Sequence, residues 1–395
     1  MADRRFYSAS GWLSQNEAWW NIVGGTPTIS TDGTLIMNFG VDEINAAFSN
    51  QPSAGDISAV ANLGAMHNLN VPSDGSWNNG EIRRFRTLSG VELFAKKTSS
   101  TTFIIRAEHS GFSASVDGTT SLTFGTDYDI SMQRLTGSPF TFRLWIGNTL
   151  EIEKDSTLTG TTNTVPLIGT DQGTANGSFT VDEDVSCFTD TLERIDASTL
   201  DSQVIVGIDA PSPQHDEYVD DETLNPISGT KISHVDNTDA GSADPVDQNT
   251  WLEQPGEADT TYRQTFHTAN ITMSNVQCVN VFQYGQANID EKSLIVFSIS
   301  ADGTNKEEGG STTSTSEDFI TGRTIFARAP DGGAWTQDDL NDFQFGTRYD
   351  TPDEAVTWRL NVIYAEAMGC DFISTAEDNV VKDMIMPVGI IPFAR

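Results

Sequence analysis

Basic side chains are scarce in this sequence, and lysine is scarcest. Of 395 residues, 22 are Lys or Arg, seven of them Lys, against 56 Asp or Glu, which gives a formal net charge of −34. Affinity for DNA, RNA and anionic membranes comes largely from Lys and Arg that neutralise phosphates. The composition therefore argues against direct binding to nucleic acid or to an anionic membrane face. An acidic, lysine-poor surface keeps a protein soluble and suits a saline environment.

Cysteine is also rare, and its spacing excludes the usual cysteine chemistry. Cys187, Cys278 and Cys370 are odd in number and far apart in the sequence, with no Cys-x-x-Cys pair. This spacing provides neither a zinc site nor a disulfide framework. We expect each cysteine to be a small buried hydrophobic residue.

Long apolar runs are missing as well. The first seven residues, MADRRFY, are polar and lack the apolar core of a signal peptide. No run approaches the roughly 20 apolar residues that a membrane helix needs. We therefore expect a protein made in a cytoplasm, without a cleavable export signal and without a membrane partner.

Motifs for nucleophilic or metal-assisted catalysis are absent. The five histidines form no His-x-His or His-Glu-x-x-His pattern, and neither a Gly-x-Ser-x-Gly elbow nor a phosphate-binding Gly-x-x-x-x-Gly-Lys-[Ser/Thr] loop occurs. We expect the histidines to be ordinary surface or turn residues. They are His67, His109, His215, His234 and His267.

What the sequence does contain is strand patterning, most clearly over residues 103–148. Large apolar side chains alternate with polar ones in short runs, and the breaks between runs contain Gly, Asp, Asn or Pro. Period-two alternation indicates strands with one buried face, and these breaks are typical of tight turns. We predict five short strands here, joined as an antiparallel meander.

The rest of the chain reads as two all-β domains. We predict a β-sandwich over 1–205, an acidic linker or excursion rich in Pro and Gly over 206–250, a jelly-roll-type sandwich over 251–370, and an extended C-terminal arm over 371–395. One short helix is expected after Trp335, capped by Thr336, with Asp338 and Asp339 in its first turn.

Two carboxylate pairs stand at the spacing that a polysaccharide hydrolase could use, because alternate residues of a strand face the same side. These are Glu151 with Glu153 and Asp127 with Asp129. In a chain with 56 acidic residues such pairs also arise by chance. No twelve-residue calcium loop is present, so we expect no cofactor, with a structural calcium ion left open.

Aromatic and basic residues provide the candidate contact surfaces. Two roles are open to Trp12, Trp19, Trp20 and Trp77: stacking on sugar rings, or buried anchoring of strand ends, which we expect to be the commoner role. Arg83, Arg84 and Arg86 form the only basic cluster and are expected to contact an acidic neighbour. In the Pro-punctuated C-terminal arm, Ile390, Ile391 and Phe393 are the expected assembly contacts.

Two resemblances follow from these segments. Residues 122–130 (LTFGTDYDI) and 142–148 (FRLWIGN) resemble the concanavalin-like or laminin-G-like sandwich, although the Glu-x-Asp-x-x-Glu strand of its hydrolases is missing. Residues 332–346 (GGAWTQDDLNDFQFG), with the strand pair over 262–284, resemble virion structural proteins of tailed bacteriophages. The second resemblance implies a capsid decoration, head-fibre or tail component.

The hypothesis that combines these features is a non-enzymatic virion protein made in the host cytoplasm. It would assemble as a symmetric homo-oligomer, contact other virion proteins and bind host surface glycans. The alternative is a polysaccharide-binding or polysaccharide-degrading protein of the glycoside hydrolase kind, either carried by a phage or secreted, using the two carboxylate pairs.

Overall fold

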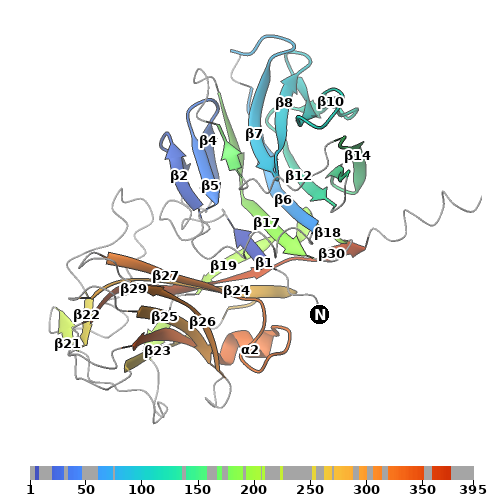
Figure 1. Ribbon diagram of the computed structural model, residues 1–395. Coiled ribbons are helices and arrows are strands. Elements are labelled where there is room, and N and C mark those ends of the chain that lie inside the picture. The colour runs from blue at the N-terminus through green and yellow to red at the C-terminus, as the bar shows by residue number, and fades with distance from the viewer. Residues whose placement is uncertain are drawn as a thin grey trace, which may run out of the picture.

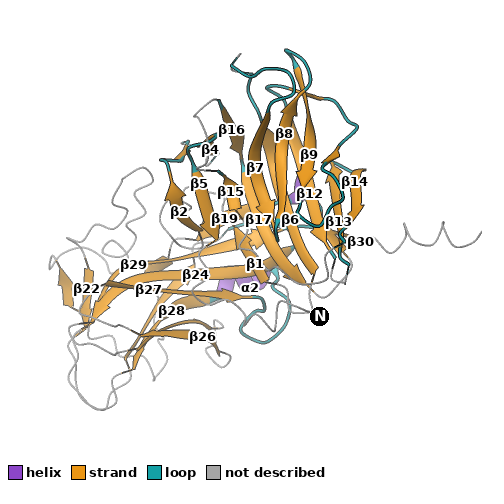
Figure 2. Cartoon of the chain, turned by 45° about the horizontal axis from the view of Figure 1, so that its top comes forward, coloured by secondary structure: helices purple, strands orange, loops and turns teal. Residues whose placement is uncertain are grey.

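A computed structural model gives the fold of the chain. It describes residues 5–8, 20–30, 34–46, 61–73, 76–135, 139–157, 167–170, 177–189, 193–205, 207–209, 223–225, 251–254, 262–268, 271–287, 293–299, 306–313, 319–350 and 358–374. Most of these residues lie in antiparallel β-strands, which form sandwich-like units (Figures 1 and 2). The prediction of an all-β chain is confirmed.

The first sandwich consists of sheets A and B. Sheet A has nine strands, ordered β14-β13-β12-β6-β16-β4-β3, with β17 also on β6 and β1 on β17. They are β1 (Arg5–Ser8), β3 (Thr28–Ile29), β4 (Leu35–Asn38), β6 (Ala61–Asn70), β12 (Asp127–Arg134), β13 (Thr141–Ile146), β14 (Thr149–Asp155), β16 (Ser178–Val181) and β17 (Glu183–Thr189). Sheet B has eight strands, ordered β10-β9-β8-β7-β15-β5-β2, with β11 on β9. They are β2 (Trp20–Gly24), β5 (Glu43–Ala46), β7 (Ile82–Leu88), β8 (Val91–Lys97), β9 (Thr102–Glu108), β10 (Val116–Asp117), β11 (Leu122–Thr123) and β15 (Leu167–Gly169).

The second sandwich consists of sheets D and E. Sheet D has six strands, ordered β21-β22-β29-β24-β27, with β19 also on β29. They are β19 (Asp201–Ile205), β21 (Thr223–Asn225), β22 (Trp251–Gln254), β24 (Val276–Ala287), β27 (Phe319–Phe326) and β29 (Trp358–Gly369). Sheet E has the order β20-β23-β28-β25-β26, from β20 (Gly207–Asp209), β23 (Tyr262–Thr268), β25 (Ser293–Ile299), β26 (Lys306–Thr313) and β28 (Gln344–Asp350). A two-stranded sheet C pairs β18 (Glu193–Ile195) with β30 (Phe372–Ser374).

Alternating side chains build the core of the first sandwich, as period-two patterning requires. On β9, Phe103, Ile105 and Ala107 are fully buried, while the residues between them are partly exposed. On β12 and β13, Met132 and Leu144 point into the same core from sheet A. This burial of apolar surface, at roughly 25 cal/mol per Å², supplies the main stabilisation of the two sheets.

The second core lies between sheets D and E and includes the single described α-helix, α2 (Gln337–Asp342). Thr336 caps α2 with Asp338 and Asp339 in the first turn, as predicted, and the structure adds a capping box between Thr336 and Asp339. The Trp335 ring packs edge-on against Phe343 at 5.2 Å, and its Nε1 donates to the Phe326 carbonyl at 2.8 Å. In the described part of the chain, no helix is long and apolar enough to cross a membrane.

A third cluster joins the two sandwiches. From the outer face of sheet A come Leu63, Ala65, Val185 and Cys187; from the connecting segment come Ile195, Ala197 and Leu200; from the second sandwich come Cys278, Met368 and Cys370. The connecting segment runs from β18 through the 3₁₀-helix η2 (Ala197–Thr199) into β19. All three cysteines are buried and none forms a disulfide, which confirms their prediction as small buried residues.

The predicted five-strand meander is wrong in its pairing. β9 carries the two short strands β10 and β11 on its edge in sheet B, whereas β12 and β13 pair with each other in sheet A. The chain therefore crosses from one sheet to the other between Thr123 and Asp127. Tight turns look alike in sequence whether the next strand pairs with the previous one or crosses the core, so local patterning does not distinguish the two.

Strand pairing also divides the chain differently from the expected boundaries at 205 and 250. β19, expected at the end of the first domain, pairs with β29 of the second sandwich. β20 and β21, within the expected linker, pair with β23 and β22. β30, at the start of the expected arm, pairs with β18. These partners lie far away in the sequence, where composition carries no signal of pairing.

Candidate functional site: a polar β-bulge on the outer face of sheet A

A β-bulge interrupts the pairing of β6 with β12. His67 and Asn68 of β6 together lie opposite the single residue Asp129 of β12. Asn68 adopts a left-handed backbone conformation with φ of +54°, which asparagine tolerates better than most residues. Bulges of this kind redirect side chains and recur beside functional sites.

The sequence of β6 requires such an irregularity. Met66 and Leu69 are both fully buried in the core of the first sandwich, although they are three positions apart. In a regular strand, residues three apart face opposite sides of the sheet. The extra residue of the bulge brings both side chains into the core and turns His67 and Asn68 toward polar partners.

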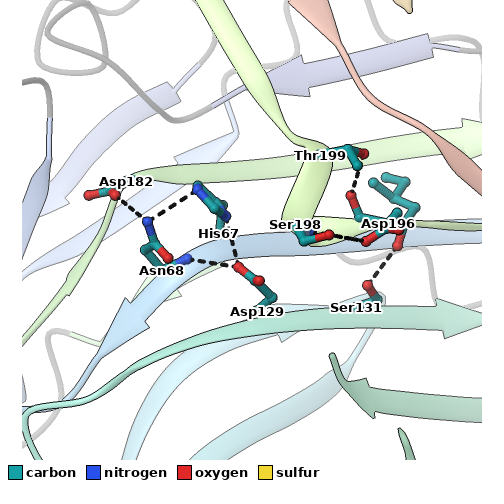
Figure 3. A network of polar contacts seen from close by, with 9 residues as sticks. His67, Asn68, Asp129, Ser131, Asp182, Asp196, Ser198 and Thr199 are labelled. Carbon is teal, nitrogen blue, oxygen red and sulfur yellow. Dashed lines mark hydrogen bonds and ion pairs between the residues drawn. The ribbon is translucent and has the colours of Figure 1, made fainter. Parts of the chain in front are cut away.

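Two aspartates, one on β12 and one between β16 and β17, hold the bulge (Figure 3). Asp129 Oδ1 accepts hydrogen bonds from His67 Nδ1 at 2.8 Å and from the Asn68 backbone N–H at 3.3 Å. Asp182, between β16 and β17, accepts from Asn68 Nδ2 at 2.7 Å through Oδ2 and from Thr34 Oγ1 at 2.8 Å through Oδ1. The bulge is therefore fixed from both sides of β6.

We call these four residues the bulge patch: His67, Asn68, Asp129 and Asp182. The patch keeps hydrogen-bonding capacity for an outside partner. The side chains of His67 and Asp129 are each 26% exposed. Within the described part of the chain, no hydrogen bond uses Asp129 Oδ2 or Asn68 Oδ1, and both are acceptors. Beside the patch, Asp127 Oδ1 accepts from the exposed Asn70 Nδ2 at 2.6 Å. A patch rich in acceptors and negative charge suits neutral donors such as hydroxyl groups and disfavours anions.

The connecting segment covers the next part of the same face. Ser131 Oγ donates to the Ile195 carbonyl at 2.6 Å, and Gln133 Nε2 donates to the Glu193 carbonyl at 3.0 Å. The guanidinium of Arg194 lies 5.0 Å from the ring centre of the buried Trp145. Figure 3 shows the contacts between Asp196 and Ser198 beside β6, next to the bulge patch. The part of sheet A that the connecting segment covers begins there.

The predicted carboxylate pairs are engaged in structural contacts. Glu151 accepts from the backbone N–H groups of Thr119 and Thr120 and from Thr120 Oγ1, and so closes the loop after β10. Burial alone would raise the pKa of Glu151, but the hydrogen bonds from Thr120 and Thr119 together lower it below its ordinary value. Glu153 pairs with Arg143 Nε at 2.9 Å. Of the second pair, Asp129 belongs to the bulge patch and Asp127 lies beside it.

The structure places Trp77 in the core. Its side chain is 6% exposed and packs edge-on against Phe39 at 5.4 Å and Phe124 at 5.7 Å, with the Arg83 guanidinium 5.3 Å from the ring centre. This placement agrees with a buried anchor and leaves little of the Trp77 ring surface for a sugar. Trp20 lies in β2, paired with Ala46. Trp12, Trp19, Ile390, Ile391 and Phe393 lie outside the described residues.

The arginine cluster divides into three different environments. Arg83 pairs with Glu81 at 3.2 Å, and Arg84 bridges Glu43 at 3.0 Å and Glu92 at 2.5 Å. Arg86 has no exposed surface and pairs with Asp184 between the two sheets. The bulge between β7 and β8 shifts the register around these residues, and the Arg86 side chain lies inside the sandwich rather than on the surface that an assembly contact would need.

No metal centre emerges among the described residues, since no three His, Cys, Asp or Glu side chains gather in a way that could hold an ion. Sequence reasoning named Asp129 but passed over His67, Asn68 and Asp182. The available signal was Asn68 between apolar residues at an odd spacing in a strand, which is typical of a bulge.

Comparisons with known proteins give distant structural matches only. No protein-family model matches the chain, and no curated protein matches it in sequence. Solved structures that are similar include domain 4 of a GH43 extracellular arabinanase from Geobacillus stearothermophilus, in complex with arabinotriose (TM-score 0.31, 11% identity, 48% of this chain and 93% of that one). Another is the CBM2 module of an evolved Dit protein of Lactobacillus casei BL23 phage J-1 (TM-score 0.31, 14% identity, 48% of this chain and 98% of that one).

A third similar structure is a carbohydrate esterase from the Shiga toxin-encoding bacteriophage phi24B (TM-score 0.33, 8% identity, 47% of this chain and all of that one, at 100%). At such low scores and identities these likenesses concern the β-sandwich fold and assign neither ligand nor activity to this chain.

Proposed function

We propose that this protein is a non-enzymatic, glycan-binding component of a tailed-phage virion, and that the bulge patch is its glycan contact. The observation that carries the binding proposal is the patch itself. Asn68 is held in a left-handed conformation by two aspartates, and acceptor atoms of Asn68 and Asp129 remain available to a ligand. Strained backbone that its surroundings hold in place is typical of binding sites.

The ligand chemistry follows from the charges of the patch. Three carboxylates, of Asp127, Asp129 and Asp182, lie on or beside it. Carboxylates are strong acceptors for hydroxyl donors, and a neutral sugar presents many hydroxyls in fixed directions. A phosphorylated or sulfated ligand would be repelled. We therefore propose a neutral glycan as the ligand.

The absence of catalysis is part of this proposal. A glycosidase needs one carboxyl group whose pKa is raised so that it can donate a proton. Glu151, a member of the pair with Glu153, instead has a lowered pKa and is occupied by backbone donors. Asp129 accepts from His67 and Asn68 through Oδ1, so only its Oδ2 is left to a ligand. These contacts favour binding over hydrolysis.

The virion component of the proposal rests on the sequence pattern of residues 332–346 and on the all-β architecture. We expect the chain to be present in purified tailed particles of its source. Mass spectrometry of those particles tests this, and absence of the chain from intact particles would contradict it.

Light scattering on the purified protein tests the oligomer, with residues 386–395 deleted as the comparison. An unchanged oligomer after deletion would count against the C-terminal arm as an assembly contact.

The decisive experiment for binding is a glycan array probed with the wild-type chain and the variants Asn68→Gly and Asp129→Asn. Glycine adopts the left-handed conformation without strain, so Asn68→Gly keeps the bulge and removes only the amide. We expect the wild type to bind a neutral glycan and each variant to bind it about tenfold more weakly or worse, since each loses a hydrogen-bonding group worth about 1–3 kcal/mol.

Glu153→Gln is the matched control, because Glu153 is an exposed carboxylate on the same sheet that pairs with Arg143. We expect Glu153→Gln to bind like the wild type. An array without any bound neutral glycan, or equal losses in all three variants, would overturn the proposal.

A further inference from the structure

Arg134 is a buried cation that pairs with no carboxylate among the described residues. It is the last residue of β12, and its side chain is 6% exposed. Alternate residues of a strand face the same side, so Arg134 shares a face of β12 with Ile130 and Met132. Both of those side chains are fully buried in the core of the first sandwich. Among the residues that the structure describes, no carboxylate pairs with Arg134, and its buried Nε has no hydrogen-bond partner.

The contrast with Arg86 shows that this arrangement is not general in the chain. Arg86 is also buried in the first sandwich, but it pairs with Asp184 and donates to the Val185 carbonyl at 3.1 Å and to Ser186 Oγ at 2.7 Å. With 56 acidic residues against 22 basic ones, a carboxylate partner was easy to provide. A buried charge without a partner is costly, which calls for a compensating group from outside.

The surroundings of Arg134 form an aromatic wall. Its Cζ lies 4.2 Å from the ring centre of Phe140, a cation–π distance that offsets only part of the cost of burial. The His109 ring stands edge-on to Phe140 at 5.0 Å and contacts Phe112 at 5.4 Å. Arg134 and its aromatic neighbours come from the ends of β9 and β12 and the start of β13, so they share one end of the sandwich.

The imidazole ring of His109 is held in its neutral form beside Arg134. Its Nδ1 accepts from the Gly111 backbone N–H at 2.9 Å, which leaves the proton of the neutral ring on Nε2. Burial, and then the charge of Arg134, lower the pKa of His109, while Glu92 acts in the opposite direction. At neutral pH the positive charge at this end of the sandwich therefore belongs to Arg134.

We propose that this end of the first sandwich binds a carboxylate, with the Arg134 guanidinium as its ionic contact and Phe140 and His109 as its aromatic wall. A guanidinium presents a planar fork of donors that matches the two oxygens of a carboxylate. The carboxylate belongs either to a uronic acid of an acidic glycan or to a small free organic acid. The site is separate from the bulge patch and does not depend on the function proposed for it.

The test measures the thermal midpoint and the affinity of the wild-type chain with four probes: an oligogalacturonide, monomeric galacturonate, acetate and a neutral oligogalactoside. We expect the carboxylate probes to raise the midpoint. Binding of the oligomer alone identifies an acidic glycan, and equal binding of monomer or acetate identifies a small organic acid. If none of the carboxylates raises the midpoint, the proposal is overturned.

Variants tie the binding to Arg134. Arg134→Met keeps an unbranched apolar stem and removes the charged guanidinium, so we expect affinity for the carboxylate to fall about tenfold or more. Without ligand, the same variant should melt higher than the wild type, because a buried charge is gone. Arg143→Met is the control, since Arg143 is paired with Glu153, and it should bind like the wild type.

Two further variants keep the outcomes distinct. If Arg134→Met does not fold, Arg134→Lys keeps the charge but lacks the planar fork and should still weaken binding. Asn68→Gly, which alters only the bulge patch, should leave carboxylate binding unchanged. Full affinity in the Arg134 variants would overturn the proposal whatever the bulge patch binds.

Discussion

At the scale of single residues, the core of the first sandwich contains an arginine–aspartate pair. Arg86 of β7 reaches across from sheet B to Asp184 of β17 in sheet A, and neither side chain has exposed surface. Burial raises the pKa of Asp184 to about 7, against the opposing attraction of Arg86. Nothing in the sequence around Arg83, Arg84 and Arg86 distinguishes the buried member from its surface neighbours, because register decides it.

This raised pKa predicts that stability falls as pH rises. Between the ordinary pKa of 3.8 and about 7, the folded chain binds more protons at Asp184 than the unfolded chain does. Raising the pH from about 5 to 7 should therefore lower the free energy of unfolding by about 2 kcal/mol through this group. Burial, and then the charge of Glu366, raise the pKa of Glu183, so it adds to the same trend.

Urea unfolding at the two pH values checks this prediction, with Asp184→Asn as the comparison. Asparagine does not titrate, so the variant should lose the part of the pH dependence that Asp184 contributes and keep the part that Glu183 contributes. A wild-type chain that is more stable at pH 7 than at pH 5 would contradict the assignment.

At the scale of elements, local patterns predicted what local forces decide. Thr336, Asp338 and Asp339 indicated the cap and start of α2, because a capping box needs only neighbouring residues. Alternation located most strands. It did not show that β11 and β12 belong to different sheets, since that choice depends on partners such as β6, about sixty residues away in the sequence.

The β6 bulge offers a prediction at this scale. Asn68→Ala and Asn68→Gly both lose the hydrogen bond to Asp182, but only alanine is strained at a φ of +54°. We expect Asn68→Ala to be less stable than Asn68→Gly by about 1 kcal/mol. Chemical denaturation of the two variants measures the difference, and an equal or more stable alanine variant would show that the bulge relaxes.

At the scale of the whole molecule, the two sandwiches share a buried junction. Leu63 and Cys187 of sheet A contact the same cluster as Cys278 and Met368 of sheet D. Ser202 Oγ on β19 donates to both carboxylate oxygens of Glu183 on β17 at 3.0 Å. The three cysteines, dispersed in sequence, meet here, which no spacing rule could have indicated.

This junction predicts that the sandwiches unfold together. Calorimetry of the wild type should show one transition. Met368→Ala should lower the free energy of unfolding by about 2–5 kcal/mol, the usual cost of a cavity at a buried methionine. It should also separate the melting of the two sandwiches into two transitions. Two transitions already present in the wild type would show that the junction does not couple them.

The bulge patch is the part of the candidate site that sequence reasoning reached least. The sequence pointed to Asp129 only as one acidic residue among many. His67, Asn68 and Asp182 form a site with it only because the fold places β6, β12 and the β16–β17 turn side by side. The chemistry of a site made by three strands is a property of their register, and register is set by the core behind it.

Hydrogen–deuterium exchange of the wild-type chain, with and without the best-bound neutral glycan, tests the central claim most directly. We predict slower exchange of backbone amides at residues 66–70, 127–130 and 182–183, where the patch would contact the ligand, and less protection in the Asn68→Gly variant at the same glycan concentration. Protection confined to other parts of the chain, or none at saturating glycan, would contradict the account.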